Sequence, residues 1–316
     1  MNKIILTDKK NVTRIDQNAA AIYLTSLNSE SGRRTMRQVL NVCAGLLSDN
    51  ADALSFAWHE LRFQHVSAIR SKLLEVYKPA TVNKTLAALR GVLRSAWQAG
   101  QMSAEDFHKA ASVKSVKGET LPAGRELTQG EITALMADCE ADKTNAGARD
   151  AAIIGLMYSC GLRREEVVML DLSDYDNETG RLVVRGKGNK ERLAWLTGGA
   201  ARALADWLAV RGDDPGALFV AVNKSGRITS LKNMTPKTIY KMLAKRATEA
   251  GVKSFSPHDM RRTFVSDLLD AGADITTVSK MAGHANVTTT SRYDRRPEDA
   301  KRKAASLLHV PYAGRA

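Results

Sequence analysis

Apolar residues recur every three or four positions through much of the first third of the chain, which is the spacing of helices that bury one face. The predicted helices cover residues 16–27, 31–47, 66–77 and 81–99. Polar residues separate the first three, and Pro79 ends the third. The pattern therefore predicts a bundle of four or five helices, which we assign to a domain over residues 14–112.

Two of these helices have a clear apolar side and several basic residues elsewhere. The expected buried side is Met36, Leu40, Cys43, Leu46 and Leu47 in one helix, and Leu86, Leu89, Leu93, Ala96 and Trp97 in the other. The basic residues off that side are Arg33, Arg34, Arg37, Lys84, Arg90 and Arg94. Taken one helix at a time, a solvated charged face explains them equally well.

A break in periodicity separates this bundle from the rest of the chain. Residues 113–125 contain Gly and Pro but no apolar repeat, which is typical of a linker. Thr128 and Glu131 then have the spacing of a capping box, so a new helix begins there. We assign residues 126–316 to a second domain.

The second domain shows mostly helical periodicity with one β-hairpin. Helices are predicted over residues 149–158, 200–211 and 238–250. Between residues 181 and 196, two apolar runs flank a Gly-Lys-Gly-Asn turn, which predicts a pair of antiparallel strands. The fold class is therefore mainly α with a small antiparallel β-sheet.

The net charge restricts the partner. The chain carries +13 at 316 residues, with a pI of about 9.7. The first 118 residues hold 17 Lys and Arg against 9 Asp and Glu, and the remainder 30 against 25. An excess of this size favours nucleic acid over a membrane, because no long apolar span is present, although a merely basic enzyme would also fit.

The cysteines do not suggest a metal site. Cys43, Cys139 and Cys160 lie far apart and lack the spacing of metal ligands. An odd number of cysteines without a signal peptide predicts buried thiols in a reducing cytoplasm.

Residues 254–296 contain the densest set of chemically active side chains. Ser256 and Pro257 predict the start of a helix, and that start sets His258 and Arg261 on one face of its first turn.

A second helix over 275–281 ends at Gly283 and is followed by His284. Thr288 to Thr290 can cap a further turn that carries Tyr293. Two imidazoles, a guanidinium and a phenol on consecutive short elements suit a phosphate with a hydroxyl nucleophile beside it.

Two earlier motifs fit the same chemistry. Arg163 lies where one helix ends and another begins, a position that favours an anion, and Glu166 can orient its guanidinium. Lys187 lies at the hairpin tip between two glycines, where it can reach a phosphate; Lys190 is the nearest rival. The Gly-Lys pair lacks the spacing of an ATP-binding loop. Each motif by itself is also explained by an ordinary surface turn.

Together the motifs resemble the tyrosine recombinase, or phage integrase, family. The resemblance rests on Gly161-Leu-Arg-Arg-Glu-Glu, Val184-Arg-Gly-Lys-Gly-Asn-Lys-Glu-Arg192, His258-Asp-Met-Arg-Arg-Thr-Phe264, and Gly283-His with Thr289-Thr-Ser-Arg-Tyr293. It covers roughly residues 125–300, and Cys160, Glu165 and Ala282 depart from the usual pattern. It implies an α-rich catalytic domain, with the N-terminal bundle as a helical (SAM-like) core-binding domain.

The resemblance also implies an activity: site-specific recombination in which DNA is cut and rejoined through a 3′-phosphotyrosyl link. The implied catalytic set is Arg163, Lys187, His258, Arg261, His284 and Tyr293. Neither a metal nor ATP nor another cofactor is expected, because the bond energy is kept in the covalent link.

Within this set Tyr293 is the nucleophile and Lys187 protonates the leaving 5′-oxygen. His258 either takes the phenol proton or binds a phosphate oxygen, and this choice stays open. Tyr240 and Tyr312 are weaker nucleophile candidates, since neither has the motif spacing.

The expected partners are a double-stranded DNA core site, contacted by the six basic residues of the bundle, and three further copies of the chain in a tetramer on two sites. No membrane partner is expected, and the location is cytoplasmic with the DNA. A basic helix over 298–308 packs either on its own domain or on a neighbour.

A non-catalytic DNA-binding protein on the same scaffold and a topoisomerase with the same chemistry remain alternatives. The biological role, whether integration, excision, dimer resolution or inversion, stays open.

Overall fold

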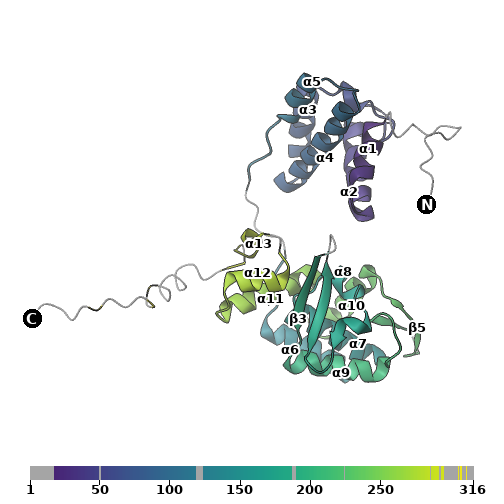
Figure 1. Cartoon of the computed structure of the whole chain (residues 1–316), viewed down its shortest axis with the longest axis vertical. Helices are drawn as coiled ribbons and strands as arrows, with labels where there is room; N and C mark the ends of the chain where they lie inside the picture. Colours follow the sequence, from purple (N-terminus) through teal and green to yellow (C-terminus); the bar gives the residue numbers. More distant parts are fainter. Residues whose placement is uncertain are drawn as a thin grey trace, which may run out of the picture. The chain divides into compact units, whose positions relative to one another are not determined.

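In a computed structural model, the chain forms two compact units, Met1–Pro122 and Ala123–Ala316 (Figure 1). The structure describes residues 18–49, 51–118, 124–186, 190–223, 225–284, 286–291, 293–294, 305, 307 and 311. The expected C-terminal helix over 298–308 and Tyr312 lie almost entirely outside the described residues.

The N-terminal unit is a bundle of five α-helices within its described part. They are α1 (Ala19–Ser26), α2 (Glu30–Leu47), α3 (Phe63–Leu74), α4 (Pro79–Gln98) and α5 (Ala104–Ala111), with a short 3-10 turn, η2 (Trp58–Glu60). Side chains of Asn18 and Ser29 cap α1 and α2, and Pro79 occupies the first turn of α4. Pro79 therefore begins a helix two residues earlier than predicted. Helix α5, which the sequence analysis missed, is short and capped by Ser103.

Helix α4 is the centre of this unit and packs against all four other helices. Leu86, Leu89 and Leu93 on its inner face are at most 1% exposed. Two predicted core positions are wrong: Leu46 is 44% exposed, and Trp97 is 37% exposed where it stacks on Phe107 at a ring distance of 5.0 Å.

Each end of the segment expected to be a linker is hydrogen-bonded to the unit that it adjoins. Asn83 on α4 exchanges two hydrogen bonds with the backbone of Val116. On the other side, the Arg125 N–H donates to Asp259 and the Leu127 N–H to Thr263. The division between the two units falls inside 113–125, and our finer domain boundaries stay a prediction.

The C-terminal unit is mainly helical with two small antiparallel sheets, and the predicted fold class is confirmed. Its helices are α6 (Gln129–Ala141), α7 (Asn145–Ser159), α8 (Arg164–Val168), α9 (Gly198–Arg211), α10 (Pro236–Glu249), α11 (Pro257–Asp270), α12 (Ile275–Ala282) and α13 (Val287–Ser291), with a 3-10 turn, η3 (Leu172–Asp174). Its strands are β1 (Tyr175–Asp176), β2 (Arg181–Gly186), β3 (Lys190–Trp195), β4 (Val220–Val222) and β5 (Ile228–Asn233). The sheets have the orders β1-β2-β3 and β4-β5.

The predicted hairpin pairs in the register Val183 to Leu193, while the β4–β5 pair was not predicted. Helix α7 fills the core, where Ile153, Ile154 and Leu156 are fully buried, and α9 and α6 pack against it.

A smaller apolar cluster joins the last helices of the described fold. Phe264, Val265 and Leu269 of α11 meet Val278 and Ala282 of α12, and Tyr293 packs at the edge of this cluster. Figure 1 shows α11, α12 and α13 together on one side of the unit, and α12 also contacts β3. The packing of α11 on α12, and of α12 on β3, thus brings the chain's later motifs next to the hairpin.

A buried ion network ties α6, α7 and α10 together. The guanidinium of Arg246 is 2% exposed and binds Asp138 at 3.1 Å, Asp142 at 2.6 Å and Asp150 at 2.9 Å. Within the described residues, no helix combines the length and apolar content that a membrane span needs.

Candidate active site

The first part of the site forms where α7 ends and α8 begins. Gly161 adopts a φ of +59°, and a Cβ on it would lie 2.4 Å from the ring of Phe264, so glycine alone fits this turn. Arg163 follows as the N-cap of α8. The Glu166 carboxylate accepts hydrogen bonds from the Arg163 backbone N–H at 2.9 Å and from its Nη1 at 2.6 Å. Arg163 is therefore held from both ends, as the sequence analysis expected of Glu166.

The second part is the first turn of α11. Ser256 caps this helix, Pro257 takes its first position, and Asp259 returns a hydrogen bond to the Ser256 N–H at 2.8 Å. His258 then lies at the surface, whereas Arg261 is only 3% exposed. The capping signals seen in the sequence thus fix where both side chains emerge.

The end of α12 gathers three arginines. Three consecutive backbone carbonyls each accept from a different guanidinium: Met281 from Arg192 Nε at 3.0 Å, Ala282 from Arg261 Nη2, and Gly283 from Arg163 Nη2 at 3.3 Å. The partial negative charge at a helix C-terminus favours cations there. Helix α12 therefore holds together arginines that come from α8, β3 and α11.

Two of these three arginines share a single carboxylate. Arg192 Nη2 binds Glu166 at 2.9 Å, beside the pair that Glu166 makes with Arg163. In the described part of the chain Arg261 is paired with no Asp or Glu; it donates to the carbonyls of Gly161, at 2.5 Å, and Ala282. A buried cation without a counter-charge is costly, so the cluster is suited to receive an anion.

The pKa shifts of Arg261 and Glu166 agree with an excess of positive charge in the cluster. Burial and the charge on Arg163 lower the pKa of Arg261 to about 9, so it is still a cation at neutral pH. Burial opposes ionisation of Glu166, but the neighbouring Arg192 and Arg163 outweigh it and lower the pKa of that carboxyl.

The phenol and the two imidazoles lie next to this cluster. Tyr293 Oη is 3.4 Å from His258 Nε2. The rings of Tyr293 and His284 stack with their centroids 6.5 Å apart, and Arg262 lies 5.5 Å from the centre of the Tyr293 ring. His284 Nδ1 is 2.8 Å from the hydroxyl oxygen of Thr290.

Both imidazoles are neutral at pH 7. Desolvation, followed by the charges on Arg262 and Arg261, lowers the pKa of His258 below its ordinary 6.5. Desolvation, followed by Arg261 and Arg163, lowers the pKa of His284 to about 4. A neutral His258 can accept a proton from the phenol beside it.

A hollow of about 330 Å³ opens beside these groups. It is lined by Arg163, Arg164, Glu165, Tyr240, Ser256, Pro257, His258 and Arg261. Among the described residues, no group of three or more His, Cys, Asp or Glu could hold a metal ion.

The structure therefore brings together Arg163, Glu166, His258, Arg261, His284 and Tyr293. Lys187 lies outside the described residues, as do Gly188 and Asn189, and the side chain of its rival Lys190 is not described either.

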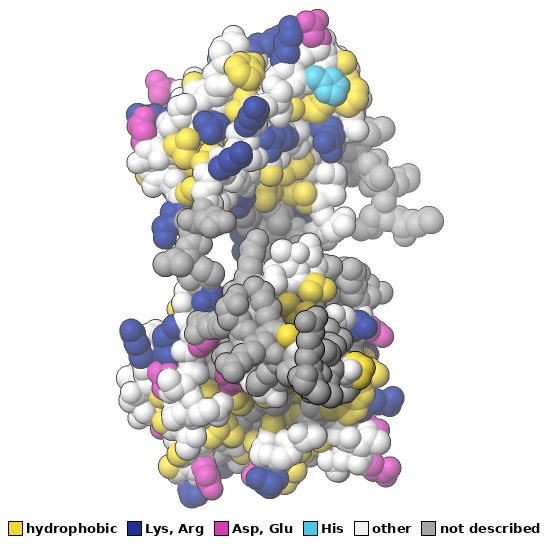
Figure 2. Space-filling model, turned by 90° about the vertical axis from the view of Figure 1, so that its left-hand side faces the viewer, with side chains coloured by type: hydrophobic (Ala, Val, Ile, Leu, Met, Phe, Trp, Pro, Cys, Tyr) yellow, Lys and Arg dark blue, Asp and Glu magenta, His cyan; other side chains and the backbone are white. Residues whose placement is uncertain are grey.

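The six basic residues of the bundle divide into two groups. Figure 2 shows many Lys and Arg side chains on one face of the N-terminal unit. Five of the six candidates are exposed: Arg33, Arg34, Arg37, Lys84 and Arg94. Arg90 is half-buried, and it donates to the carbonyls of Ala111 at 3.1 Å and Val113 at 2.6 Å. Arg90 thus holds the chain after α5, a role that the sequence analysis did not foresee.

Three residues of the site were missed. Arg192 ends the quoted hairpin motif, but only the pairing of β2 with β3 shows that it faces Glu166. Arg262 follows Arg261 and lies against the nucleophile candidate. Thr290 was treated only as part of a helix cap, although its spacing of six from His284 was visible.

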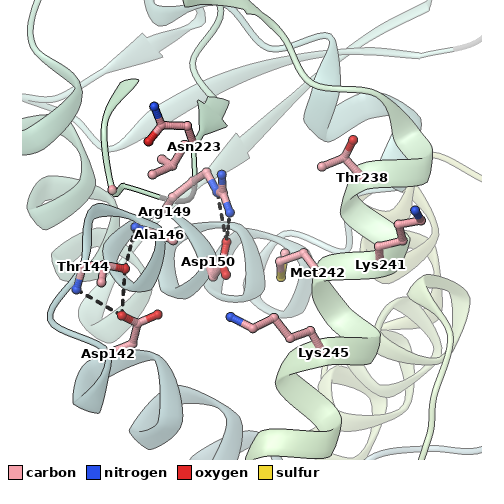
Figure 3. A pocket seen from close by; sticks show the side chains of 12 residues that line it. Asp142, Thr144, Ala146, Arg149, Asp150, Asn223, Thr238, Lys241, Met242 and Lys245 are labelled. Atoms are coloured by element: carbon pink, nitrogen blue, oxygen red, sulfur yellow. Dashed lines mark hydrogen bonds and ion pairs between the residues drawn. The ribbon is translucent and has the colours of Figure 1, made fainter. Parts of the chain in front are cut away.

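A larger hollow, of about 500 Å³, lies elsewhere in the C-terminal unit and holds none of the predicted site residues (Figure 3). Several of its polar side chains are bound to their neighbours: Asp142 accepts from Thr144, and Arg149 pairs with Asp150 at 2.7 Å.

The site thus places a phenol beside two imidazoles and a cluster of arginines. Residues 125–299 match the phage integrase family, and the chain belongs to this family, that of the tyrosine recombinases.

Among its relatives, tyrosine recombinase XerD of Caulobacter vibrioides is 30% identical over 274 residues, which cover 83% of this chain and 87% of that protein. Tyrosine recombinase XerC of Myxococcus xanthus is 35% identical over 251 residues, which cover 70% and 81%.

Two solved structures have the same fold. The integrase of transposon Tn1549, in complex with transposon right end DNA, has a TM-score of 0.66 at 18% identity, covering 94% of this chain and 99% of that one. A lambda integrase dimer bound to a core site has a TM-score of 0.65 at 14% identity, covering 88% and 94%.

Proposed function

We propose that this chain is a site-specific DNA recombinase that cuts and rejoins DNA strands through a 3′-phosphotyrosyl intermediate. One observation carries the proposal: a phenol lies 3.4 Å from a neutral imidazole, next to a buried guanidinium that has no carboxylate partner among the described residues. Family membership and the XerC and XerD relatives support the same activity.

In the cleavage step, Tyr293 Oη attacks the phosphorus of a DNA phosphodiester. The phenol proton passes to His258 Nε2, and the new bond is a tyrosyl ester of the 3′-phosphate. The negative charge that develops on the non-bridging oxygens is stabilised by the forked donors of Arg163 and Arg261. The 3.4 Å approach and the neutral imidazole favour His258 as base over His258 as phosphate ligand.

The second half of the step is departure of the 5′-oxygen. As the bond between phosphorus and this oxygen breaks, Lys187 donates the proton that makes it a 5′-hydroxyl. Rejoining is the reverse reaction with a 5′-hydroxyl from another strand. One ester replaces another, so the proposed reaction needs neither ATP nor a metal ion.

The proposed partners follow from this chemistry. Double-stranded DNA is bound by the arginine cluster of the site and by the exposed arginines and lysines of the N-terminal unit. Exchange between two duplexes needs four strand cuts, so we propose a tetramer of this chain on two sites, acting in the cytoplasm. Integration of a mobile element is one use of such an enzyme.

The test traps the covalent link. A library of nicked duplexes with randomised sequence is incubated with the chain, and adducts that survive denaturation are isolated and sequenced. Wild type should give adducts enriched in one sequence, whereas Tyr293→Phe should bind DNA but give none, because the bond-forming oxygen is gone. Tyr240→Phe is the matched control and should give adducts.

An undiminished yield of adduct from Tyr293→Phe would remove Tyr293 as the nucleophile. Adducts without any enriched sequence would instead point to a topoisomerase. No adduct from wild type would leave a non-catalytic DNA-binding protein.

A further inference from the structure

Thr290 makes two contacts that link the motifs on either side of it. Its side chain is fully buried on α13, and its hydroxyl oxygen is 2.8 Å from His284 Nδ1. Its backbone carbonyl accepts a hydrogen bond from the Tyr293 N–H at 2.9 Å. One residue therefore contacts both an imidazole of the site and the nucleophile's backbone.

The direction of the side-chain hydrogen bond follows from burial. A buried hydroxyl proton needs an acceptor, because a buried donor has lost its hydrogen bond to water and destabilises the fold if no other acceptor replaces it. In the described part of the chain, the only hydrogen-bond partner of the Thr290 hydroxyl is His284 Nδ1. The hydroxyl is consequently the donor, and Nδ1 accepts with its lone pair.

This direction fixes the tautomer of His284. A neutral imidazole carries one N–H, so a ring that accepts at Nδ1 has its proton on Nε2. The ring is neutral because desolvation and the cations Arg261, Arg163 and Arg192, together with His258, lower its pKa to about 4.

We propose that Thr290 is a positioning residue that holds His284 as the Nε2–H tautomer, so that this ring offers a fixed donor to a phosphate oxygen. The opposite tautomer would turn a lone pair towards an anionic oxygen and repel it. The statement on the tautomer stands on the contacts above; its use in DNA cleavage rests on the proposed function.

The first experiment measures the tautomer in the full chain without DNA. With ¹⁵N-labelled histidine, the two ring nitrogens of His284 are distinguished by their couplings to the ring protons, and His284→Gln identifies its signals among the six histidines. The expected result near pH 7 is a protonated Nε2 and an unprotonated Nδ1. A proton on Nδ1 overturns the proposal, whether or not the chain cleaves DNA.

The second experiment compares two substitutions of Thr290. Thr290→Val keeps the shape but removes the hydroxyl, whereas Thr290→Ser keeps the hydroxyl. Adduct formation on a nicked duplex from the enriched sequence should slow about 3- to 10-fold in Thr290→Val, the worth of one hydrogen bond, with unchanged DNA affinity. The Nδ1 signal of His284 should also shift, and Thr290→Ser should restore both readouts.

Equal cleavage rates and equal Nδ1 signals in Thr290→Val and wild type would overturn the positioning role. If Thr290→Val does not fold, the tautomer measurement still decides. If wild type forms no adduct on any DNA, the proposed function fails while the tautomer measurement stands.

Discussion

Arg261 shows at the level of one residue how burial prepares a site for its ligand. Its guanidinium is 3% exposed and bound to backbone carbonyls only, among the residues that the structure describes. Such a cation is costly to bury, and an incoming phosphate supplies the missing charge. The forked donor set of arginine also allows it to bind the carbonyls and a phosphate oxygen at once, which a lysine ammonium does less well.

The role of Lys187 as general acid can be tested with sulfur. A 5′-alkoxide is a poor leaving group, since the pKa of an aliphatic hydroxyl is close to that of water, about 15.7. A thiol ionises near about 8.5 and leaves without a donated proton. Lys187→Ala should therefore slow cleavage of ordinary DNA on the order of 10²–10⁴-fold, yet cleave a 5′-bridging phosphorothiolate nearly as fast as wild type.

Lys190→Ala is the control for this prediction, since it lies on the same hairpin and should leave both rates nearly unchanged. If Lys187→Ala is equally slow on both substrates, the lysine holds the phosphate and does not protonate the leaving group.

The lowered pKa of His284 predicts how stability depends on pH. The unfolded chain takes up a proton near 6.5 and the folded chain only near about 4, so the unfolded state binds more protons between these values. The free energy of unfolding should therefore decrease as the pH falls from 6.5 towards 4. His284→Gln removes this contribution, and its stability should decrease less over the same range.

Chemical denaturation at a series of pH values measures both proteins, and the difference between them isolates His284 from the carboxylates that also titrate. Parallel curves for the two proteins would mean that the ring is not desolvated as the structure shows.

At the level of elements, the C-terminal end of α12 joins parts of the site that are far apart in sequence. Its last carbonyls hold Arg163, Arg192 and Arg261, which come from α8, β3 and α11. A shift of α12 would move three cations at once, because each is anchored to adjacent peptide groups. The position of α12 therefore determines where the three positive charges of the site lie.

The ion network on α10 gives a prediction about stability. Arg246→Ala should lower the free energy of unfolding by about 3–5 kcal/mol, because it leaves buried carboxylates of α6 and α7 without their cation. Lys245→Ala, one residue earlier, removes only an exposed pair with Glu249 and should change stability by less than about 0.5 kcal/mol. Urea unfolding at pH 7 compares the two, and equal losses would contradict a buried network.

For the whole molecule, the question is whether both units bind DNA. Each has its own apolar core, and the net positive charge is denser in the first. Each phosphate contact adds a slope of about −0.9 to log K against log salt.

Full-length protein should therefore lose affinity more steeply with salt than a fragment of residues 119–316. Titration of one labelled duplex at several salt concentrations gives both slopes. Charge reversal of Arg33, Arg34 and Arg37 should reduce the full-length slope, while equal slopes for the chain and the fragment would mean that residues 1–118 make no phosphate contacts.

The sequence by itself determined the elements whose signals lie within a few residues. Ser256, Pro257 and Asp259 begin α11, and with it the places of His258 and Arg261. Thr128 and Glu131 begin α6, and the glycine turn between two apolar runs gives the β2–β3 hairpin. Caps and tight turns are contacts between near neighbours, so the order of residues already specifies their geometry.

Only the tertiary structure decided which distant groups meet. Arg192 binds the carbonyl of Met281, 89 positions away, because α12 packs against β3. Arg90 carries the same helical pattern as its exposed neighbours, yet the returning chain after α5 provides carbonyls that turn it inward. Periodicity assigns a side chain to a face of its helix, but the partner on that face comes from how the whole chain packs.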